Sequence, residues 1–366
     1  MTAQPARLVS AGAISSETHC IAFDAPLQCE SGASISNPHV AYRTWGTLNA
    51  AGDNAVLVCH ALTGSADVDD WWPDLIGAGG VLDPATDFIV CSNVLGGCYG
   101  TTGPYSVRPD AGGERYGAGI GRITVRDMVQ LQKRLLDHLG VTRVQLAIGP
   151  SLGGMQVLEW AASFPQFVNR IAPIGVSAIH SAWCIGVSSA QRAAIKADPN
   201  WQGGQYDDAH RPAAGLAAAR MMAMVTYRSW ENFESRFAGP THASGEHAVS
   251  SYLDYQGAKL HERFDAASYV CLTQAMDSHD VGRGREGGTA GVLSRMQCPA
   301  LVVSVSSDVL YPPREQRWLA EQLPNATYSV LDSEHGHDGF LIDTQALFAQ
   351  IRQFRQTSEA VSRSVA

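Results

Sequence analysis

The sequence lacks the segments that usually identify a membrane protein or a secreted protein. No stretch approaches the roughly 18 uninterrupted apolar residues that a membrane-spanning helix needs, and residues 1–12 contain no apolar run of signal-peptide length. A basic stripe is also missing, because the net charge of −9 comes from carboxylates dispersed along the chain. We therefore expect a cytoplasmic protein that binds neither membranes nor nucleic acid.

Motifs typical of metal or disulfide sites are missing as well. The eight cysteines include no C-x-x-C pair, and without a secretory signal we expect them to be reduced. No H-E-x-x-H motif is present either. We therefore expect no metal site.

What the sequence does contain is the composition of a folded globular protein, with 45% hydrophobic and 17% charged residues. Its 366 residues allow a core with a substantial insertion, since single domains commonly reach about 250 residues.

Six short apolar runs predict strands that are covered on both faces. Between two of them, at residues 125–139, apolar residues recur at helical spacing, and this pattern ends at Gly140. Strands that alternate with helices indicate a mainly parallel sheet flanked by helices. The predicted strands are residues 55–59, 87–91, 143–148, 170–176, 300–305 and 328–332.

The alternation stops between residues 179 and 297, where helix-forming stretches follow one another without a strand. This segment is too long for an ordinary loop, so we predict a helical cap at 179–297 inserted into a core of 1–178 and 298–366. We also expect a final helix over 341–354 and a frayed tail after Gln356. The clearest helical stretches of the cap are 215–227, 246–264 and 266–276.

The strongest local motif is Gly149-x-Ser151-x-Gly153, which joins a predicted strand to a helical run. Small residues beside the serine permit the sharp, strained turn that exposes a nucleophile. The turn would place Ser151 at a helix N-terminus, where backbone N–H groups stabilise an anionic intermediate. The alternative is a glycine-rich turn with an incidental serine, but the change from strand to helix favours a nucleophile.

A nucleophilic serine needs a base and a carboxylate that orients the base, in the chain order Ser, Asp, His for such a strand-to-helix turn. Asp308 follows the run 300–305, and His337 lies in a polar loop after 328–332. Taken singly, Asp308 is equally typical of a helix N-cap and His337 of a solvated loop. Together with Ser151 they predict a catalytic triad. His335 remains an alternative base. The His-x-His-Asp sequence could also belong to a metal site, but no motif supplies the third protein ligand that catalytic zinc generally takes.

Two backbone N–H groups are candidates for an oxyanion hole. One belongs to Leu152, directly after the nucleophile, and the other to Leu62 in the loop 59–64. His60 in that loop precedes the nucleophile, and its position favours a role in packing the loop.

Several longer motifs complete the pattern, namely HALTG at 60–64, WW at 71–72, CSNVLGGCYGTTGP at 91–104, GGMQ at 153–156, HDVGRGR at 279–285 and GHDGF at 336–340. Together they resemble the homoserine O-acetyltransferase family over residues 40–354. The resemblance implies an α/β-hydrolase fold with a helical cap. It also implies the transfer of an acetyl group from acetyl-CoA to L-homoserine, a step toward methionine.

The resemblance assigns the nucleophile, acid and base to Ser151, Asp308 and His337. It further implies that Arg220 holds the carboxylate of the amino acid, for which a bidentate guanidinium is well suited, and that Asp338 lies near its amino group. Acetyl-CoA is then a substrate, no cofactor is tightly bound, and the chain pairs as a homodimer through its cap helices.

Two alternatives remain open. A related O-acyltransferase would use a succinyl donor, or serine or another alcohol as acceptor. An esterase would use the same triad with water as acceptor, since fold and triad do not distinguish hydrolysis from transfer.

Overall fold

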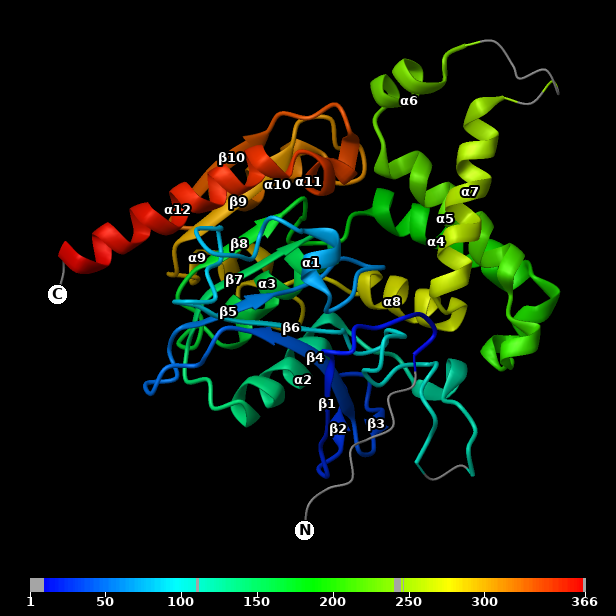
Figure 1. The fold of residues 1–366 in the computed structure, drawn as a ribbon, viewed down its shortest axis with the longest axis horizontal. Helices are drawn as coiled ribbons and strands as arrows, with labels where there is room; N and C mark the ends of the chain where they lie inside the picture. Colours follow the sequence, from blue (N-terminus) through cyan, green and yellow to red (C-terminus); the bar gives the residue numbers. More distant parts are fainter. Residues whose placement is uncertain (1–9, 110–111, 240–244, 246, 365–366) are drawn as a thin grey trace.

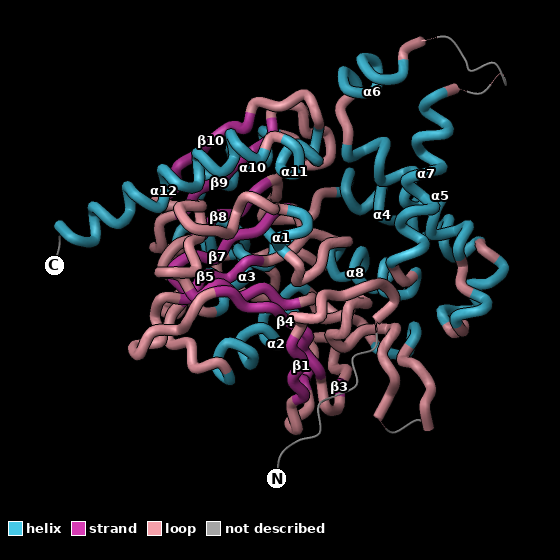
Figure 2. The backbone as a smooth tube through the Cα atoms, viewed as in Figure 1, coloured by secondary structure: helices cyan, strands magenta, loops and turns pink. Residues whose placement is uncertain are grey.

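The computed structural model describes residues 10–109, 112–239, 245 and 247–364, and an eight-stranded sheet forms its centre (Figures 1 and 2). The strand order is β1-β4-β6-β5-β7-β8-β9-β10. Strands β5 to β10 run parallel, whereas β1 and β4 are antiparallel to their neighbours. The strands are β1 (His19–Ala22), β4 (His39–Trp45), β5 (Ala55–Val58), β6 (Phe88–Ser92), β7 (Val144–Pro150), β8 (Ile171–Ile174), β9 (Ala300–Val305) and β10 (Ala326–Leu331), and β2 (Leu27–Gln28) and β3 (Ser34–Ile35) form a separate pair.

All six predicted strands are confirmed, and they form the parallel part of the sheet. Alternate residues of a strand face opposite sides, so that Leu57 packs into one apolar cluster and Val56 and Val58 into another. Both clusters are covered by helices, which explains why these strands are apolar on both faces. The first cluster includes residues of α2 (Val125–His138), α3 (Leu152–Ser163) and α10 (Pro313–Gln322), and the second includes residues of α1 (Val68–Trp71), α11 (Gly339–Ile342) and α12 (Thr344–Ser364).

The helix predicted at 125–139 is confirmed as α2. It begins after Thr124, whose side chain forms a capping box with Asp127. The prediction of a frayed tail after Gln356 was wrong, because the backbone of α12 continues to Ser364. The sequence from 357 to 364 contains neither glycine nor proline, so nothing in it interrupts a helix that Ile351 and Phe354 anchor on the sheet.

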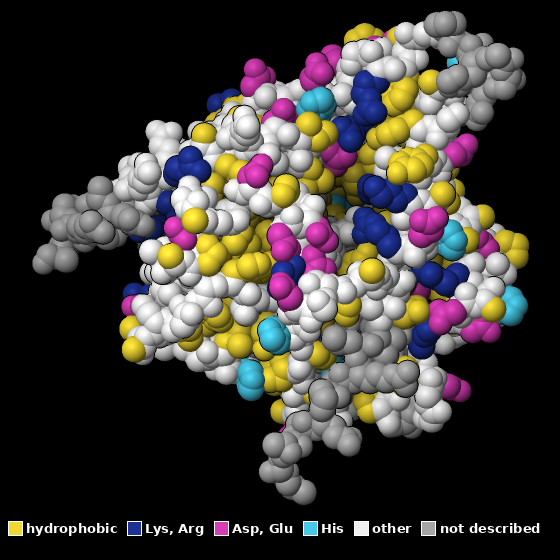
Figure 3. All heavy atoms as spheres, viewed as in Figure 1, with side chains coloured by type: hydrophobic (Ala, Val, Ile, Leu, Met, Phe, Trp, Pro, Cys, Tyr) yellow, Lys and Arg dark blue, Asp and Glu magenta, His cyan; other side chains and the backbone are white. Residues whose placement is uncertain are grey.

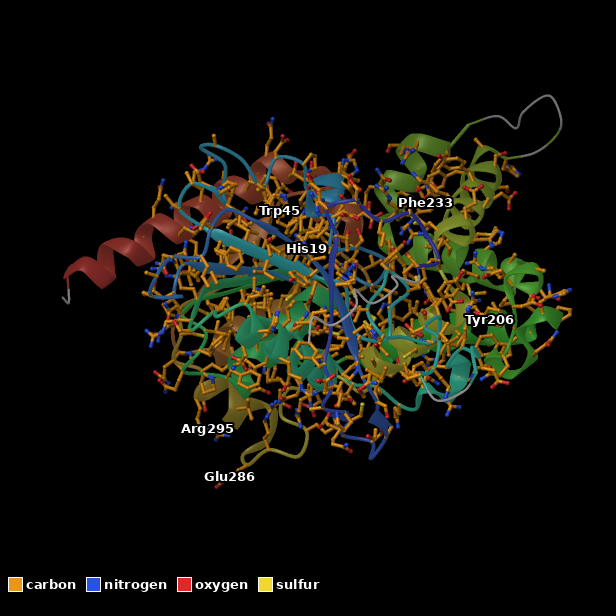
Figure 4. All side chains as sticks on the ribbon, turned by 60° about the horizontal axis from the view of Figure 1, so that its bottom comes forward. His19, Trp45, Tyr206, Phe233, Glu286 and Arg295 are labelled. Atoms are coloured by element: carbon orange, nitrogen blue, oxygen red, sulfur yellow. The ribbon has the colours of Figure 1, made fainter. Side chains whose placement is uncertain are left out.

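The segment between β8 and β9 is helical, and α5, α7 and α8 match the stretches predicted there. In Figures 1 and 2, α4 to α7 stand beside the sheet, whereas α9 lies with the helices that cover it in Figure 1. The side view separates Tyr206 and Phe233 on the helical part from His19 and Trp45 on the strands (Figure 4). The division into core and cap stays an interpretation of this arrangement. The helices are α4 (Ala182–Ala197), α5 (Ala213–Tyr227), α6 (Trp230–Phe237), α7 (Ala248–Arg263), α8 (Ala266–Asp277) and α9 (Gly288–Ser294).

The order of the strands marks a place for a ligand. From β5 the chain moves to β6 on one side, and it then crosses over β5 to β7 and continues to β8 on the other side. In parallel sheets, ligands bind outside the carboxyl ends of the strands where the order reverses in this way. The loop after β5 and the turn after β7 lie at this point.

Within the described ranges, none of the helices combines the length and the apolar composition that crossing a bilayer requires.

Candidate active site

Ser151 occupies the turn between β7 and α3 in a strained conformation. Its backbone has φ 54° and ψ −122°, a region that side-chain-bearing residues rarely adopt and that often marks functional sites. Its N–H donates a hydrogen bond of 2.9 Å to the carbonyl of Ile174 at the end of β8. The turn from strand to helix that the sequence predicted is therefore present, with Ser151 directly before the first residue of α3.

The glycines of the motif are required by close backbone contacts. A Cβ atom added to Gly153 would lie 2.0 Å from the carbonyl oxygen of Cys59, and one added to Gly149 would lie 2.6 Å from the same atom. Any side chain at these two positions would therefore push the turn away from the loop after β5.

Asp308 and His337 are joined by a direct hydrogen bond. The distance from Nδ1 of His337 to Oδ2 of Asp308 is 2.7 Å, and both side chains are buried. The other carboxylate oxygen of Asp308 accepts hydrogen bonds of 2.9 Å from the backbone N–H groups of Leu310 and Tyr311. The carboxylate is thus fixed by its own loop and in turn orients the imidazole.

The remaining ring nitrogen of His337 is available for a reacting group. Nε2 is buried and has no hydrogen-bond partner among the described residues. A Cβ atom added to Gly175 would lie 3.4 Å from Cε1 of His337, and Gly175 follows Ile174, which accepts the bond from the N–H of Ser151. The structure therefore brings His337 to the end of β8, beside the turn that holds Ser151.

The electrostatic environment of His337 favours a proton on the ring. Burial alone would lower the pKa of His337, but the charge and the hydrogen bond of Asp308 outweigh it, so that the pKa is raised above its ordinary value. An imidazole in this setting accepts a proton readily, and the fixed carboxylate then stabilises the positive charge of the ring.

His335, the alternative base, points elsewhere. Its Nδ1 lies 3.0 Å from the side-chain nitrogen of Asn232 on α6. The hydrogen bond to Asp308 therefore belongs to His337 alone of the two histidines. In the described part of the chain, no group of three or more His, Cys, Asp or Glu side chains is arranged to hold a metal ion.

Leu62 and Leu152 lie on two segments that meet at the turn. A Cβ atom added to Gly153 would lie 3.2 Å from the carbonyl oxygen of His60, so α3 starts against the loop that carries Leu62. A hydrogen bond of 2.9 Å from Gly64 to Ala61 closes this loop into a tight turn. Within the described residues, neither the N–H of Leu62 nor that of Leu152 has a hydrogen-bond partner.

His60 packs the same loop. Its Nε2 accepts a hydrogen bond of 3.1 Å from the N–H of Val94, and its Nδ1 lies 2.8 Å from the carbonyl of Ala61. Burial lowers the pKa of His60 to about 4, so the ring stays neutral and Nδ1 donates. Both nitrogens are then occupied, as expected for a packing role.

Arg220 and Asp338 lie at the border between α5 and the short 3-10 turn η4 (Gly336–Asp338). Asp338 is buried, and its Oδ2 lies 3.3 Å from Nε of Arg228. Burial raises the pKa of Asp338 above its ordinary value, and the positive charges of Arg228 and Arg220 oppose this rise. Arg220 is therefore close enough to Asp338 to influence its charge.

Two residues of this border, Tyr227 and Arg228, were not predicted from the sequence. The ring of Tyr227 lies 5.7 Å from that of His337 and 5.5 Å from the guanidinium carbon of Arg220. A Cβ atom added to Gly336 would lie 2.6 Å from the backbone of Arg228. The end of α5 is thus pressed against the turn that carries His337.

The arrangement suits nucleophilic attack on an acyl group. A strained serine at a helix N-terminus is suited to act as a nucleophile, a buried imidazole held by a carboxylate is suited to act as its base, and the segments that carry Leu62 and Leu152 meet at the same turn. Two arginines and a buried carboxylate lie beside His337 and bring charges of both signs to the site.

Known proteins resemble this chain over nearly its whole length. A protein-family model described as "alpha/beta hydrolase fold" matches residues 54–344. The homoserine O-acetyltransferase of Trichormus variabilis is 54% identical over 345 residues, which cover 94% of this chain and 95% of the relative.

Two solved structures show the same fold with different activities in their names. Esterase E22 has a TM-score of 0.85 and 25% identity, covering 93% of this chain and 99% of its own. A homoserine O-acetyltransferase from Staphylococcus aureus has a TM-score of 0.75 and 27% identity, covering 92% and 94%.

Proposed function

Because the chain belongs to the homoserine O-acetyltransferase family, whose members have the α/β-hydrolase fold, we propose that it transfers the acetyl group of acetyl-CoA to the hydroxyl of L-homoserine. The observation that carries this proposal is the 54% identity to such an enzyme over 94% of the chain. The product, O-acetyl-L-homoserine, serves methionine biosynthesis.

We propose that Ser151, Asp308 and His337 perform the transfer in two steps. His337 takes the proton of Ser151 as Oγ attacks the thioester, and the proton then leaves with the CoA thiol. The hydroxyl of homoserine next attacks the acetyl ester on Ser151, His337 takes its proton and returns it to Oγ, and the product departs. The Asp308–His337 bond of 2.7 Å supports this assignment.

The oxyanion formed in each step would be held by the N–H groups of Leu62 and Leu152. Both belong to segments that meet at the turn, and neither has another partner within the described residues. Preorganised donors of this kind stabilise the charge that develops in the transition state.

The acceptor would be held by Arg220 and Asp338. A guanidinium binds a carboxylate in a bidentate manner, and a buried carboxylate attracts the amino group of an amino acid. Arg228, which lies 3.3 Å from Asp338, would share that carboxylate with the amino group. Lys and Arg side chains form a row along the helical part of the molecule where it borders the sheet (Figure 3), which suits an anionic acyl donor such as acetyl-CoA. No tightly bound cofactor takes part in these steps.

We further propose a cytoplasmic homodimer. Met222 and Val225 on α5, Trp230 on α6 and Tyr255 on α7 are exposed apolar or aromatic side chains, which would be covered by the same helices of a second copy. Size-exclusion chromatography with light scattering would give twice the mass of the chain; a monomer at all concentrations would refute this assembly.

The second candidate function is ester hydrolysis, favoured by the similarity to esterase E22. Incubation with acetyl-CoA and L-homoserine separates the two, with O-acetyl-L-homoserine and acetate measured as products. We expect the ester to dominate at saturating homoserine. If the amount of acetate released does not fall when homoserine is added, the protein is a hydrolase. If succinyl-CoA or L-serine is preferred in competition, the protein is a related acyltransferase.

The acceptor site is tested with Arg220→Ala. Losing a charge-assisted bidentate contact should raise the KM for homoserine about tenfold to a hundredfold. Arg236→Ala is the matched control, because Arg236 lies on α6 over the rings of Phe237 and Tyr252. Equal KM values for homoserine in the two variants would show that Arg220 does not bind the acceptor.

A further inference from the structure

Tyr311 contacts both partners of the Asp308–His337 pair. Its backbone N–H donates a hydrogen bond of 2.9 Å to Asp308, and its ring lies 5.2 Å from the ring of His337, tilted by 34°. The side chain is completely buried. A displacement of Tyr311 would therefore move the acid and the base together.

The hydroxyl of Tyr311 is held by a second buried histidine. It lies 3.1 Å from Nδ1 of His180, which belongs to the segment between β8 and α4. The backbone N–H of His180 donates to the carbonyl of His279 at 2.9 Å, so the backbone at His180 is held by the loop that follows α8.

The other ring nitrogen of His180 faces a carboxylate. Nε2 lies 3.9 Å from Oδ1 of Asp277 at the end of α8. Both atoms are buried, and neither has a hydrogen-bond partner within the described residues. The second oxygen of Asp277 accepts a bond of 2.5 Å from Arg192 on α4. A donor and an acceptor that are both unsatisfied favour any movement that brings them together.

The protonation state of His180 is consistent with a chain of contacts from Tyr311 through His180 to Asp277. Burial lowers the pKa of His180 to about 3, so the imidazole is neutral and carries one N–H. If the hydroxyl of Tyr311 donates to Nδ1, the proton of His180 lies on Nε2 and points at Asp277.

We propose that Asp277 and His180 form a positioning relay that holds the hydroxyl of Tyr311 and, through Tyr311, keeps His337 and Asp308 in their reactive geometry. The relay connects α4 and α8 to the base, so the seating of the helical segment determines how well His337 is aligned. It rests on the proposed function, since His337 must act as the base for alignment to matter.

Tyr311→Phe tests the relay, with Tyr328→Phe as the matched control. Both changes remove one hydrogen-bonded hydroxyl from the same half of the molecule, since Tyr328 lies 2.8 Å from the hydroxyl of Ser304. The rate of Ser151 acylation is measured from the burst of p-nitrophenolate with p-nitrophenyl acetate. We expect Tyr311→Phe to lower this rate about fivefold to tenfold and Tyr328→Phe to leave it unchanged, at similar losses of Tm.

Variants of His180 provide a second test of the relay. His180→Leu should slow acylation as much as Tyr311→Phe, and the double variant should be no slower than either single one, because both changes break the same chain of contacts. His180→Gln keeps an acceptor and a donor and should recover most of the rate. Should His180→Leu fail to fold, Tyr311→Phe and His180→Gln decide the matter.

Equal acylation rates in Tyr311→Phe and Tyr328→Phe would overturn the relay, and so would independent, multiplying effects in the double variant. The proposed function fails separately: a wild-type protein that gives the burst but acetylates no homoserine contradicts the acceptor, while the variants still report on the relay through the burst.

Discussion

At the scale of single residues, the catalytic proposal depends on the charge of His337. Its Nδ1 is held by the carboxylate of Asp308 at 2.7 Å, and the pKa of His337 is raised above its ordinary value because this charge outweighs the effect of burial. A base must be neutral to accept a proton. Activity should therefore fall as the pH is lowered through the raised pKa of His337.

The pH profile of kcat/KM for the acyl donor tests this directly, since it reports the free enzyme. We expect the acidic limb above the ordinary histidine value of about 6.5. Asp308→Asn should move the limb to lower pH and reduce the plateau by a factor on the order of 10⁴. Asp332→Asn is the control, because Asp332 is exposed and bonds Ser306. An unshifted limb in Asp308→Asn would show that another group titrates.

Where a motif exists, the sequence predicted which residues the structure brings together. The pairing of Asp308 with His337 followed from their order after Ser151, although nothing in the residues alone distinguished His337 from His335. Tyr227 and Arg228 carry no motif, and they reach the site only because α5 ends against Gly336. Such a contact between distant segments depends on tertiary packing, which the sequence pattern does not express.

At the scale of elements, the turn between β7 and α3 is defined by its closeness to the loop after β5. The carbonyl of Cys59 leaves no room for a side chain at Gly153. Gly186, in the interior of α4, is exposed and has no neighbouring atom within 4 Å of an added Cβ. The two glycines therefore respond in opposite ways to the same substitution.

We predict that Gly153→Ala lowers the free energy of unfolding by about 3 kcal/mol or more, because the added carbon meets rigid backbone. Gly186→Ala should raise it by about 0.5–1 kcal/mol, because alanine loses less backbone entropy in a helix. Urea denaturation of both variants measures the difference. A Gly153→Ala protein of wild-type stability would contradict the close contact.

Two of the elements that the sequence did not predict, β4 and α4, have polar residues on their buried faces. Strand β4 carries the buried Arg43, whose charge is balanced by Asp67 at 3.1 Å and Asp69 at 2.5 Å. Helix α4 buries Ser188 and Gln191, and Gln191 accepts a bond of 3.0 Å from Tyr269. A search for apolar periodicity overlooks faces of this kind, because their polar groups are satisfied only by distant partners.

At the scale of the whole molecule, a buried ionic network joins the segment after α8 to the helices of the sheet. Glu159 on α3 is bonded by Arg285 at 2.9 Å and by Arg126 on α2 at 3.0 Å, and its side chain is only 3% exposed. Arg283 adds a bond of 2.8 Å to Glu30. The two arginines of the HDVGRGR motif are thus explained by the fold and need no part in the chemistry.

We predict that Glu159→Gln lowers the free energy of unfolding by about 3 kcal/mol, because it leaves the guanidinium group of Arg285 without its buried counter-charge and Arg126 with Glu30 as its remaining carboxylate. Asp137→Asn removes the partner of Lys133 in an exposed pair and should change stability by less than about 0.5 kcal/mol. Denaturant titration at low and high salt measures the free energy of unfolding of both variants. Similar losses in both variants would show that Glu159 has no special role.

The central claim is that an acetyl group passes to homoserine through an ester on Ser151, and intact-mass spectrometry tests it most directly. After mixing with acetyl-CoA, the wild-type protein should gain one acetyl group, which L-homoserine discharges as O-acetyl-L-homoserine, and Ser151→Ala should gain none. A wild-type protein that forms O-acetyl-L-homoserine without ever carrying the acetyl group, or an adduct that persists in Ser151→Ala, would contradict the account.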